Sequence, residues 1–182
     1  MLNMAVALSL RSTLLSVLPN HRSEASVLIK WPNDVVLWHA QTHRKCAGIL
    51  VENVWRGSEW THAVIGIGAN VSSQRLTRSY RAVSLLEAWQ VTMDPISLAH
   101  RIAADLLQTL HAPMQASNVL AGFQNHLMGL NERRTYVHQG SEHIGTLCEI
   151  NGAGHGRFAW QDPQTAPPEW LPSSEIAWVW GQ

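Results

Sequence analysis

The feature that most constrains the fold is a series of four short β-rich segments in the first half of the chain. They comprise residues 27–29, 35–38, 46–54 and 60–67. Each is rich in β-branched, aromatic or other apolar residues, and turn-forming residues such as Pro32, Asn33 and Gly57 separate them, as in strands joined by hairpins. Four strands so close together along the chain predict an antiparallel sheet.

Helical patterns lie on both sides of these strands. Apolar residues have a mostly helical spacing over residues 2–18. Asp94 and Pro95 form an N-cap and first-turn pair, and apolar residues then recur every three or four positions over residues 96–110. Shorter helices are predicted over residues 84–89 and 117–130. Helices and hairpins in one chain predict an α+β fold.

The pattern changes to short β segments after residue 132. They cover residues 135–138, 143–150, 157–160 and 176–180, and glycines and the proline-containing stretch 163–172 separate them. This change predicts a second domain, a small β barrel or sandwich. We therefore divide the chain into residues 1–131 and 132–182.

Composition excludes several classes of function. The chain has 13 basic and 13 acidic residues, so it lacks the positive surface with which proteins follow a phosphate backbone, and we expect no nucleic-acid binding. No segment approaches the roughly 20 apolar residues that cross a bilayer, so we expect no membrane partner. Cys46 and Cys148 are too sparse for a disulfide scaffold, which predicts two free thiols and a cytoplasmic protein.

Three short motifs follow one another in the predicted sheet. They are Lys30-Trp31-Pro32-Asn33-Asp34, then residues 45–52 (KCAGILVE), then residues 64–71 (VIGIGANV). Each motif is short, but their order and nearness make a specific combination. Together they resemble biotin protein ligases, and the resemblance extends more weakly through the later helices and the β-rich tail.

The resemblance implies a fold and a reaction. Residues 1–131 would form a biotin ligase catalytic domain of the class II synthetase-like type, with a mixed or antiparallel sheet and packed helices, and residues 132–182 an SH3-like β barrel. Such enzymes join biotin to ATP as biotinyl-5'-AMP and pass the biotinyl group to a lysine of a biotin carboxyl carrier protein. ATP and biotin would be the substrates, with Mg²⁺. A carboxylase carrier domain would be the partner, and a homodimer is one possible assembly.

The chemistry explains the residue types of the motifs. Attack of a carboxylate on an α-phosphate brings two anions together, so the site needs a fixed cation and oriented donors. By resemblance, Lys45 is the central catalytic lysine, and Asp34 is a second catalytic residue that also binds Mg²⁺. The biotin site would comprise Lys45, Gly48, Leu50 and Gly66. The nucleotide site would comprise Lys30, Asn33, Gly68 and Asn70. Leu50 and Ile67 would form apolar walls, and the glycines would let ligand approach the backbone.

Each of these residues also has a structural explanation. Lys30 and Asp34 are ordinary charges for strand ends, Asn33 suits a turn, and Lys45 suits the exposed edge of a hairpin. Only their combination favours a site. The Gly66-x-Gly68 pair does not indicate a dinucleotide site, because that motif needs a third glycine and opens a βαβ unit.

The hairpin of residues 37–43 is longer than is common in the family, and we expect it to protrude without a function. His39 and His43 could be combined with Cys46 as metal ligands, but no closed ligand set appears in the sequence. We therefore expect no transition-metal site there.

Two parts of the family's site are expected before residue 1. These are a Gly/Arg-rich loop that closes over biotin and the phosphates, and an early strand that contacts biotin. We therefore expect an N-terminally truncated ligase whose activity is reduced or lost, because charge compensation and water exclusion would be incomplete. Two alternatives remain open: a non-catalytic module that keeps carrier or dimer contacts, and a related lipoate-type acyltransferase, which residues 30–34 fit less well.

Overall fold

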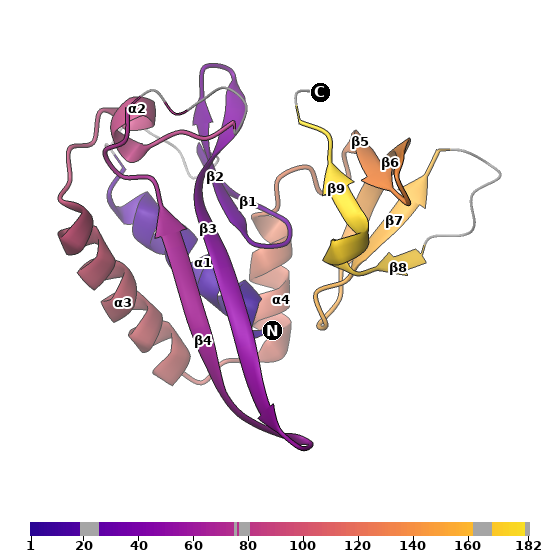
Figure 1. Cartoon of the computed structure of the whole chain (residues 1–182), viewed down its shortest axis with the longest axis horizontal. Helices are drawn as coiled ribbons and strands as arrows, with labels where there is room; N and C mark the ends of the chain where they lie inside the picture. Colours follow the sequence, from indigo (N-terminus) through magenta and orange to yellow (C-terminus); the bar gives the residue numbers. More distant parts are fainter. Residues whose placement is uncertain (19–25, 75, 77–80, 162–168, 181–182) are drawn as a thin grey trace.

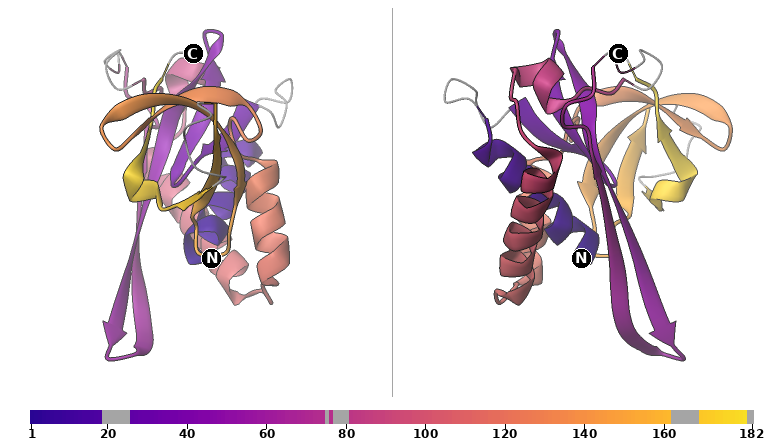
Figure 2. Two further views of the ribbon diagram at one scale, coloured as in Figure 1. Left: turned by 90° about the vertical axis from the view of Figure 1, so that its right-hand side faces the viewer. Right: turned by 60° about the vertical axis from the view of Figure 1, so that its left-hand side comes forward.

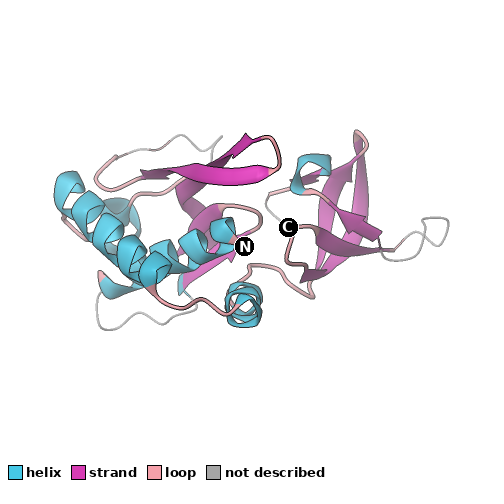
Figure 3. Cartoon of the chain, turned by 90° about the horizontal axis from the view of Figure 1, so that it is seen from below, coloured by secondary structure: helices cyan, strands magenta, loops and turns pink. Residues whose placement is uncertain are grey.

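The computed structural model describes residues 1–18, 26–74, 76, 81–161 and 169–180 (Figure 1). This part of the chain forms two antiparallel sheets, and the second sheet lies beside the body made by the first sheet and its helices (Figures 1 and 3). The α+β class predicted from the sequence is confirmed.

The first sheet contains the four predicted strands. They are β1 (Val27–Lys30), β2 (Asp34–His39), β3 (Thr42–Arg56) and β4 (Glu59–Ala69), in the order β1-β2-β3-β4. All neighbouring strands are antiparallel, as the short connections predict. The β3–β4 hairpin turns at Gly57, which has a φ of 62°, and its outer part projects as an arm beyond the body (Figure 2).

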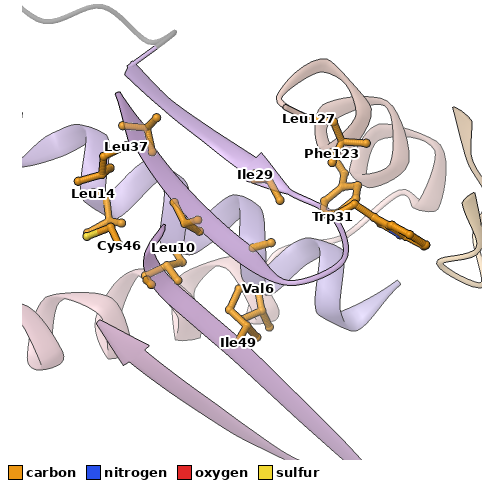
Figure 4. Packing of buried hydrophobic residues seen from close by; sticks show 14 of the residues in the cluster. Val6, Leu10, Leu14, Ile29, Trp31, Leu37, Cys46, Ile49, Phe123 and Leu127 are labelled. Carbon is orange, nitrogen blue, oxygen red and sulfur yellow. The ribbon is translucent and has the colours of Figure 1, made fainter. Parts of the chain in front are cut away.

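Three long helices cover one face of this sheet. They are α1 (Leu2–Ser16), α3 (Pro95–His111) and α4 (Ala116–Asn125), and the short helix α2 (Leu85–Trp89) follows β4 (Figure 1). The apolar side chains of α1 pack directly on the sheet, where Leu10 and Leu14 lie near Leu37 and Ile49 (Figure 4). The core of the first domain therefore lies between α1 and the sheet. Among the described residues, the opposite face of β3 and β4 keeps Leu50 and Val64 exposed.

Helix α4 ends earlier than the sequence predicts. The helix was expected to run over residues 117–130, but it ends at Asn125 because the following backbone pairs with β1. The amide of Ile29 donates to the carbonyl of His126, and the amide of Met128 donates to the carbonyl of Ile29, both at 2.8 Å. Leu127, expected on the apolar side of the helix, is buried by this pairing instead.

The second sheet contains five short strands. They are β5 (Arg133–His138), β6 (Ser141–Ile150), β7 (Gly156–Trp160), β8 (Glu169–Leu171) and β9 (Ile176–Trp178), and the 3-10 helix η3 (Ser173–Glu175) precedes β9. Their order is β8-β7-β6-β5-β9, so β8 and β9 are the two edges of the described sheet. The expected closed SH3-like barrel is not confirmed: each edge strand has three residues, which leaves little backbone for closure in the described part of the domain.

Trp31 joins the two sheets. Its indole Nε1 donates to the carbonyl of Gly154 at 3.0 Å, and its ring lies 5.8 Å from the ring of Phe158. The amide of Ile150 also donates to the side chain of Gln124 at 2.9 Å. Buried residues of both sheets consequently belong to one hydrophobic cluster. The division of the chain at residue 131 stays a prediction.

None of the helices in the described residues has the length and apolar character needed to cross a lipid bilayer.

Candidate active site

Three glycines, Gly48, Gly66 and Gly68, form part of the surface of β3 and β4 on the side away from the described helices. We call this surface the glycine floor. Gly48 pairs with Gly68, and Leu50 pairs with Gly66, so these four residues lie together on one face of the two strands. A Cβ atom added at Gly68 would meet nothing within 4 Å, and one added at Gly66 would meet only Leu50, at 3.8 Å. This surface can therefore accept a ligand close to the backbone.

A β-bulge brings Lys45 to the same face. Val35 pairs with Ala47 and Val36 pairs with Lys45, so Cys46 is the extra residue of β3. In a regular strand, Lys45 and Gly48 would point to opposite faces, because side chains alternate with a period of two. The bulge reverses this alternation, and a Cβ added at Gly48 would lie 3.0 Å from the Nζ of Lys45.

The backbone of Lys45 is held on both its amide and its carbonyl by a distant segment. The amide of Lys45 donates to the carbonyl of Arg81 at 2.8 Å, and the amide of Val83 donates to the carbonyl of Lys45 at 2.9 Å. Cys46 points into the core, where burial raises the pKa of its thiol to about 12. The bulge therefore separates a buried thiol from an ammonium group that faces solvent.

Three charged side chains meet at this edge of the site. The Nζ of Lys45 lies 2.6 Å from Oδ1 of Asp34, and the Nζ of Lys30 lies 3.8 Å from its Oδ2. Lys30 and Lys45 are the two lysines of the chain. The Lys45 side chain is 41% exposed, whereas those of Lys30 and Asp34 are 11% and 12% exposed. Of these two lysines, Lys45 is therefore the one that a ligand can reach more easily.

Burial has a clear effect on Lys30. Desolvation lowers its pKa below the usual range; the Asp34 carboxylate acts in the opposite direction, and Lys45 adds to the lowering. The structure therefore brings together the predicted residues Lys30, Asp34, Lys45 and Gly48, with one carboxylate between two ammonium groups.

Asn33 has a structural partner. Its amide nitrogen donates to the carbonyl of Ile49 at 2.7 Å, and the amide of Ile49 donates to the carbonyl of Asn33 at 2.9 Å. These two bonds fix the turn between β1 and β2 against β3.

Asn70 lies at the end of β4. Its amide donates to the carbonyl of Cys46 at 2.8 Å, and its carbonyl accepts from the amide of Leu85 at 3.0 Å. The backbone of Asn70 therefore connects β3 with the first residue of α2, and this holds the predicted nucleotide residue in a fixed place beside the glycine floor.

Leu50 and Ile67 were both expected to line the apolar walls, but they lie on opposite faces of the sheet. Leu50 is on the open face and is 60% exposed. Ile67 pairs with Ile49 and faces α3, where it lines an apolar cavity with Leu98 and Ile102. The expectation for Ile67 was wrong. Leu50 pairs with Gly66, and Ile67 follows Gly66 on the same strand, so its side chain points to the opposite face.

The long hairpin of residues 37–43 does not simply protrude. The rings of Trp38 and His43 lie 4.9 Å apart, and both residues line a cavity of about 160 Å³ with Trp178 and Trp180. No group of three or more His, Cys, Asp or Glu side chains is placed to hold a metal ion in the described residues, and these include His39, His43 and Cys46.

Trp178 and Trp180 are site residues that the sequence did not reveal. The ring centroids of Trp178 and Trp180 lie 5.4 Å and 5.0 Å from the Nζ of Lys30. Among nine tryptophans, no spacing or neighbouring motif distinguishes these two. Their role depends on how the second sheet packs against β1, which local patterns do not report.

The arrangement around Asp34 fits Mg²⁺ poorly. In nucleotide sites Mg²⁺ is held by one or two carboxylates together with phosphate oxygens. The Asp34 carboxylate already faces two ammonium groups. This suits a charge-pairing role better than a metal-ligand role. The Mg²⁺ role stays a prediction.

Comparisons with known proteins agree with this geometry. Residues 1–70 match the model of the Biotin/lipoate A/B protein ligase family. A search of curated proteins finds no match.

Solved structures of biotin protein ligases share the fold. A biotin protein ligase from Aquifex aeolicus has a TM-score of 0.72 and 18% identity, over 97% of this chain and 72% of that one. The same enzyme in complex with biotin and ATP has a TM-score of 0.70 and 18% identity, over 97% and 69%. The Leishmania major enzyme with biotinyl-5-AMP has a TM-score of 0.53 and 21% identity, over 94% and 70%. Residues 1–70, which hold the motifs and the charged site, thus carry the sequence signature of the Biotin/lipoate A/B protein ligase family, and the chain has the fold of biotin protein ligases.

Proposed function

We propose that this chain acts as a biotin protein ligase, which forms biotinyl-5'-AMP from biotin and ATP and transfers the biotinyl group to a lysine of a biotin carboxyl carrier protein. The observation that carries the proposal is the position of Lys45. Its ammonium group is held 2.6 Å from Asp34 at the edge of an open glycine floor. An ordered cation beside a surface where glycines expose the backbone suits two anionic substrates.

Each half-reaction needs what Lys45 supplies. In the first, a biotin carboxylate oxygen attacks the α-phosphorus, the bond to the β-phosphate oxygen breaks, and pyrophosphate leaves. In the second, the carrier lysine attacks the acyl carbonyl, loses a proton, and AMP leaves. Both steps concentrate negative charge on oxygen atoms, which a fixed ammonium group stabilises. Asp34 orients that ammonium group and offsets its charge before substrates bind.

The remaining predicted residues are distributed around Lys45. Gly48, Leu50 and Gly66 lie on the open face, where we place biotin. The proposed nucleotide residues lie where the strands β1, β2 and β4 begin or end, and they are Lys30, Asn33, Gly68 and Asn70. A cytoplasmic location and a carboxylase carrier domain as partner belong to the same proposal.

The first test measures the two half-reactions separately with the purified chain. Biotin-dependent exchange of pyrophosphate into ATP would support adenylate formation, and transfer from added biotinyl-5'-AMP to a carrier domain would support the second step. Lipoate is the competing substrate. Exchange that depends on lipoate and not on biotin would contradict the biotin assignment, and carrier binding without either half-reaction would favour a non-catalytic module.

The second test removes the central cation. Lys45→Ala should lower the rate of adenylate formation by about 100-fold, the usual order for one charge-stabilising donor. Arg56→Ala, at the tip of the β3–β4 arm, is the matched loss of one positive charge and should leave the rate unchanged. Circular dichroism spectra of both variants should match that of the parent chain. An unchanged exchange rate in Lys45→Ala would remove the role assigned to Lys45.

A further inference from the structure

Two tryptophans from the end of the chain cover Lys30. Trp178 lies on β9 and Trp180 follows that strand, and the Nζ of Lys30 is 5.4 Å and 5.0 Å from the two ring centroids. A lysine ammonium group within about 6 Å of a tryptophan ring is attracted by the negative face of the ring. Lys30 therefore interacts with the second sheet as well as with Asp34.

The two rings are themselves held by other cations. The guanidinium group of Arg81 lies 5.9 Å from the ring of Trp180, and that of Arg134 lies 5.7 Å from the ring of Trp178. Arg81 belongs to the segment whose carbonyl accepts from the amide of Lys45. The rings are thus fixed by contacts with three separate parts of the chain.

Lys30 and Lys45 share the same carboxylate. Oδ2 of Asp34 faces Lys30 and Oδ1 faces Lys45. A lysine with full access to water samples many rotamers and holds a carboxylate weakly. Covering Lys30 with two rings restricts those rotamers and strengthens its attraction to Asp34, because the local dielectric constant is lower.

We propose that Trp178 and Trp180 are positioning residues for adenylate formation: they hold Lys30 against Asp34, and Asp34 in turn holds the ammonium group of Lys45 in place for the substrates. The proposal rests on the function proposed above. It gives the second sheet a role in the reaction, through contacts within the chain and without any contact with the reacting atoms.

Trp180 allows the sharper test of the two. Trp178 also packs against Tyr136, with 5.3 Å between ring centroids, so its loss would disturb the second sheet directly. Trp180 lies beyond the last strand. Trp170, on β8, is the matched control, because its ring lies 6.0 Å from the guanidinium group of Arg157, away from the site. The variants are Trp180→Leu, Trp180→Phe and Trp170→Leu.

The first measurement does not depend on activity. With ¹³C-labelled lysine, the chain contributes two lysine side-chain ε-methylene signals in a proton–carbon correlation spectrum, one from Lys30 and one from Lys45. The rings should shift the Lys30 protons upfield. Trp180→Leu should move the Lys30 signal toward the ordinary lysine position and should also shift the Lys45 signal, whereas Trp170→Leu should move neither. A Lys30 signal that stays in place, or a Lys45 signal that does not respond, would overturn the proposal.

The second measurement is steady-state kinetics of adenylate formation. Trp180→Leu should lower kcat about 10-fold and change the KM for biotin less than about twofold, because the substrate still binds while Lys45 is misplaced. Trp180→Phe keeps an aromatic ring and should restore most of kcat. A normal kcat in Trp180→Leu would overturn the proposal. An inactive parent chain would contradict the proposed function instead, and the lysine signals would still decide whether the tryptophans position Lys45.

Discussion

Gly48 and Gly68 face each other across β3 and β4, but a side chain would have a different effect at each. A Cβ at Gly48 would lie 3.0 Å from the Nζ of Lys45 and 3.4 Å from Oδ1 of Asp34, whereas a Cβ at Gly68 would enter open space. One glycine therefore leaves room for the ion pair, and the other leaves room for a ligand. The motif pattern indicated both glycines, but only the structure shows that their surroundings differ.

The pair of glycines yields a prediction about activity. Gly48→Ala should displace Lys45 from Asp34 and lower kcat for adenylate formation. Gly68→Ala, at the proposed nucleotide site, should raise the KM for ATP with a smaller effect on kcat. Gly68→Ala should unfold at the parent concentration of urea or slightly above it, since a Cβ in open space costs nothing and alanine reduces the entropy of the unfolded chain. Gly48→Ala should gain less, because it also loses the ion pair between Lys45 and Asp34. Equal kinetic effects of the two substitutions would contradict this division of roles.

The sequence predicted where some residues of the candidate site lie, but it did not predict all of their contacts. Asn33 was read as a nucleotide residue or a turn residue, and its amide nitrogen in fact binds the carbonyl of Ile49. Ile67 was placed on the wrong face. Hydrogen bonds and face assignments of this kind depend on the register between two strands, and a single sequence motif contains no information about the partner strand.

At the scale of elements, the short helix α2 shows how one side chain can hold two segments. Ser84 is fully buried; its hydroxyl accepts from the amide of Glu87 at 3.0 Å and donates to the carbonyl of Ser73 at 2.6 Å. The first bond is the N-cap that the sequence predicts for a serine in this position. The second bond connects the helix with the segment that follows β4, close to Asn70.

Loss of this hydroxyl should lower the free energy of unfolding. Ser84→Ala removes an N-cap and the bond to the carbonyl of Ser73, for which we expect a cost of about 1 kcal/mol. Ser97→Ala is the matched control, because the Ser97 hydroxyl donates to Asp94 at an exposed position and its amide keeps that partner. Urea titrations followed by circular dichroism measure both variants. A loss no larger in Ser84→Ala than in Ser97→Ala would show that the buried cap contributes little.

Element boundaries were predicted well where they depend on local signals. Asp94 caps α3 as expected, and its side chain accepts from the amide of Ser97 at 2.8 Å. The end of α4 was predicted poorly, because β1 captures the backbone of residues 126–128. A cap is local chemistry between residues that are near in sequence, whereas this pairing joins residues about a hundred positions apart.

At the scale of the whole molecule, Trp31 is one of the residues that join the two sheets. It is 1% exposed, and it contacts Phe158 and the carbonyl of Gly154 in the second sheet. It also belongs to the motif that contains Lys30 and Asp34. Packing between the two sheets and the geometry of the candidate site therefore depend on adjacent residues.

Replacing Trp31 should destabilise the whole chain. Trp31→Ala should cost about 4 kcal/mol, as is usual when a large buried aromatic side chain is removed. Trp55→Ala is the control on the β3–β4 arm, where the side chain is 59% exposed, and it should change stability by less than about 0.5 kcal/mol. Because the hydrophobic cluster is continuous, amide hydrogen exchange in β3 and β6 should accelerate together in Trp31→Ala. Acceleration limited to β6 would indicate two separate cooperative units.

The sequence alone determined the α+β class, the order of the helices and of the strands except β8 (Glu169–Leu171), which lies in a stretch expected only to separate strands, the first sheet of hairpins and the segment that contains the candidate site. These follow from hydrophobic periodicity, turn residues and caps, which act between residues close together in the chain. Only the tertiary structure decided that a bulge turns Lys45 toward Asp34, that the second sheet stays open in its described part, and that Trp178 and Trp180 cover Lys30. Those features depend on strand register and on packing between distant segments.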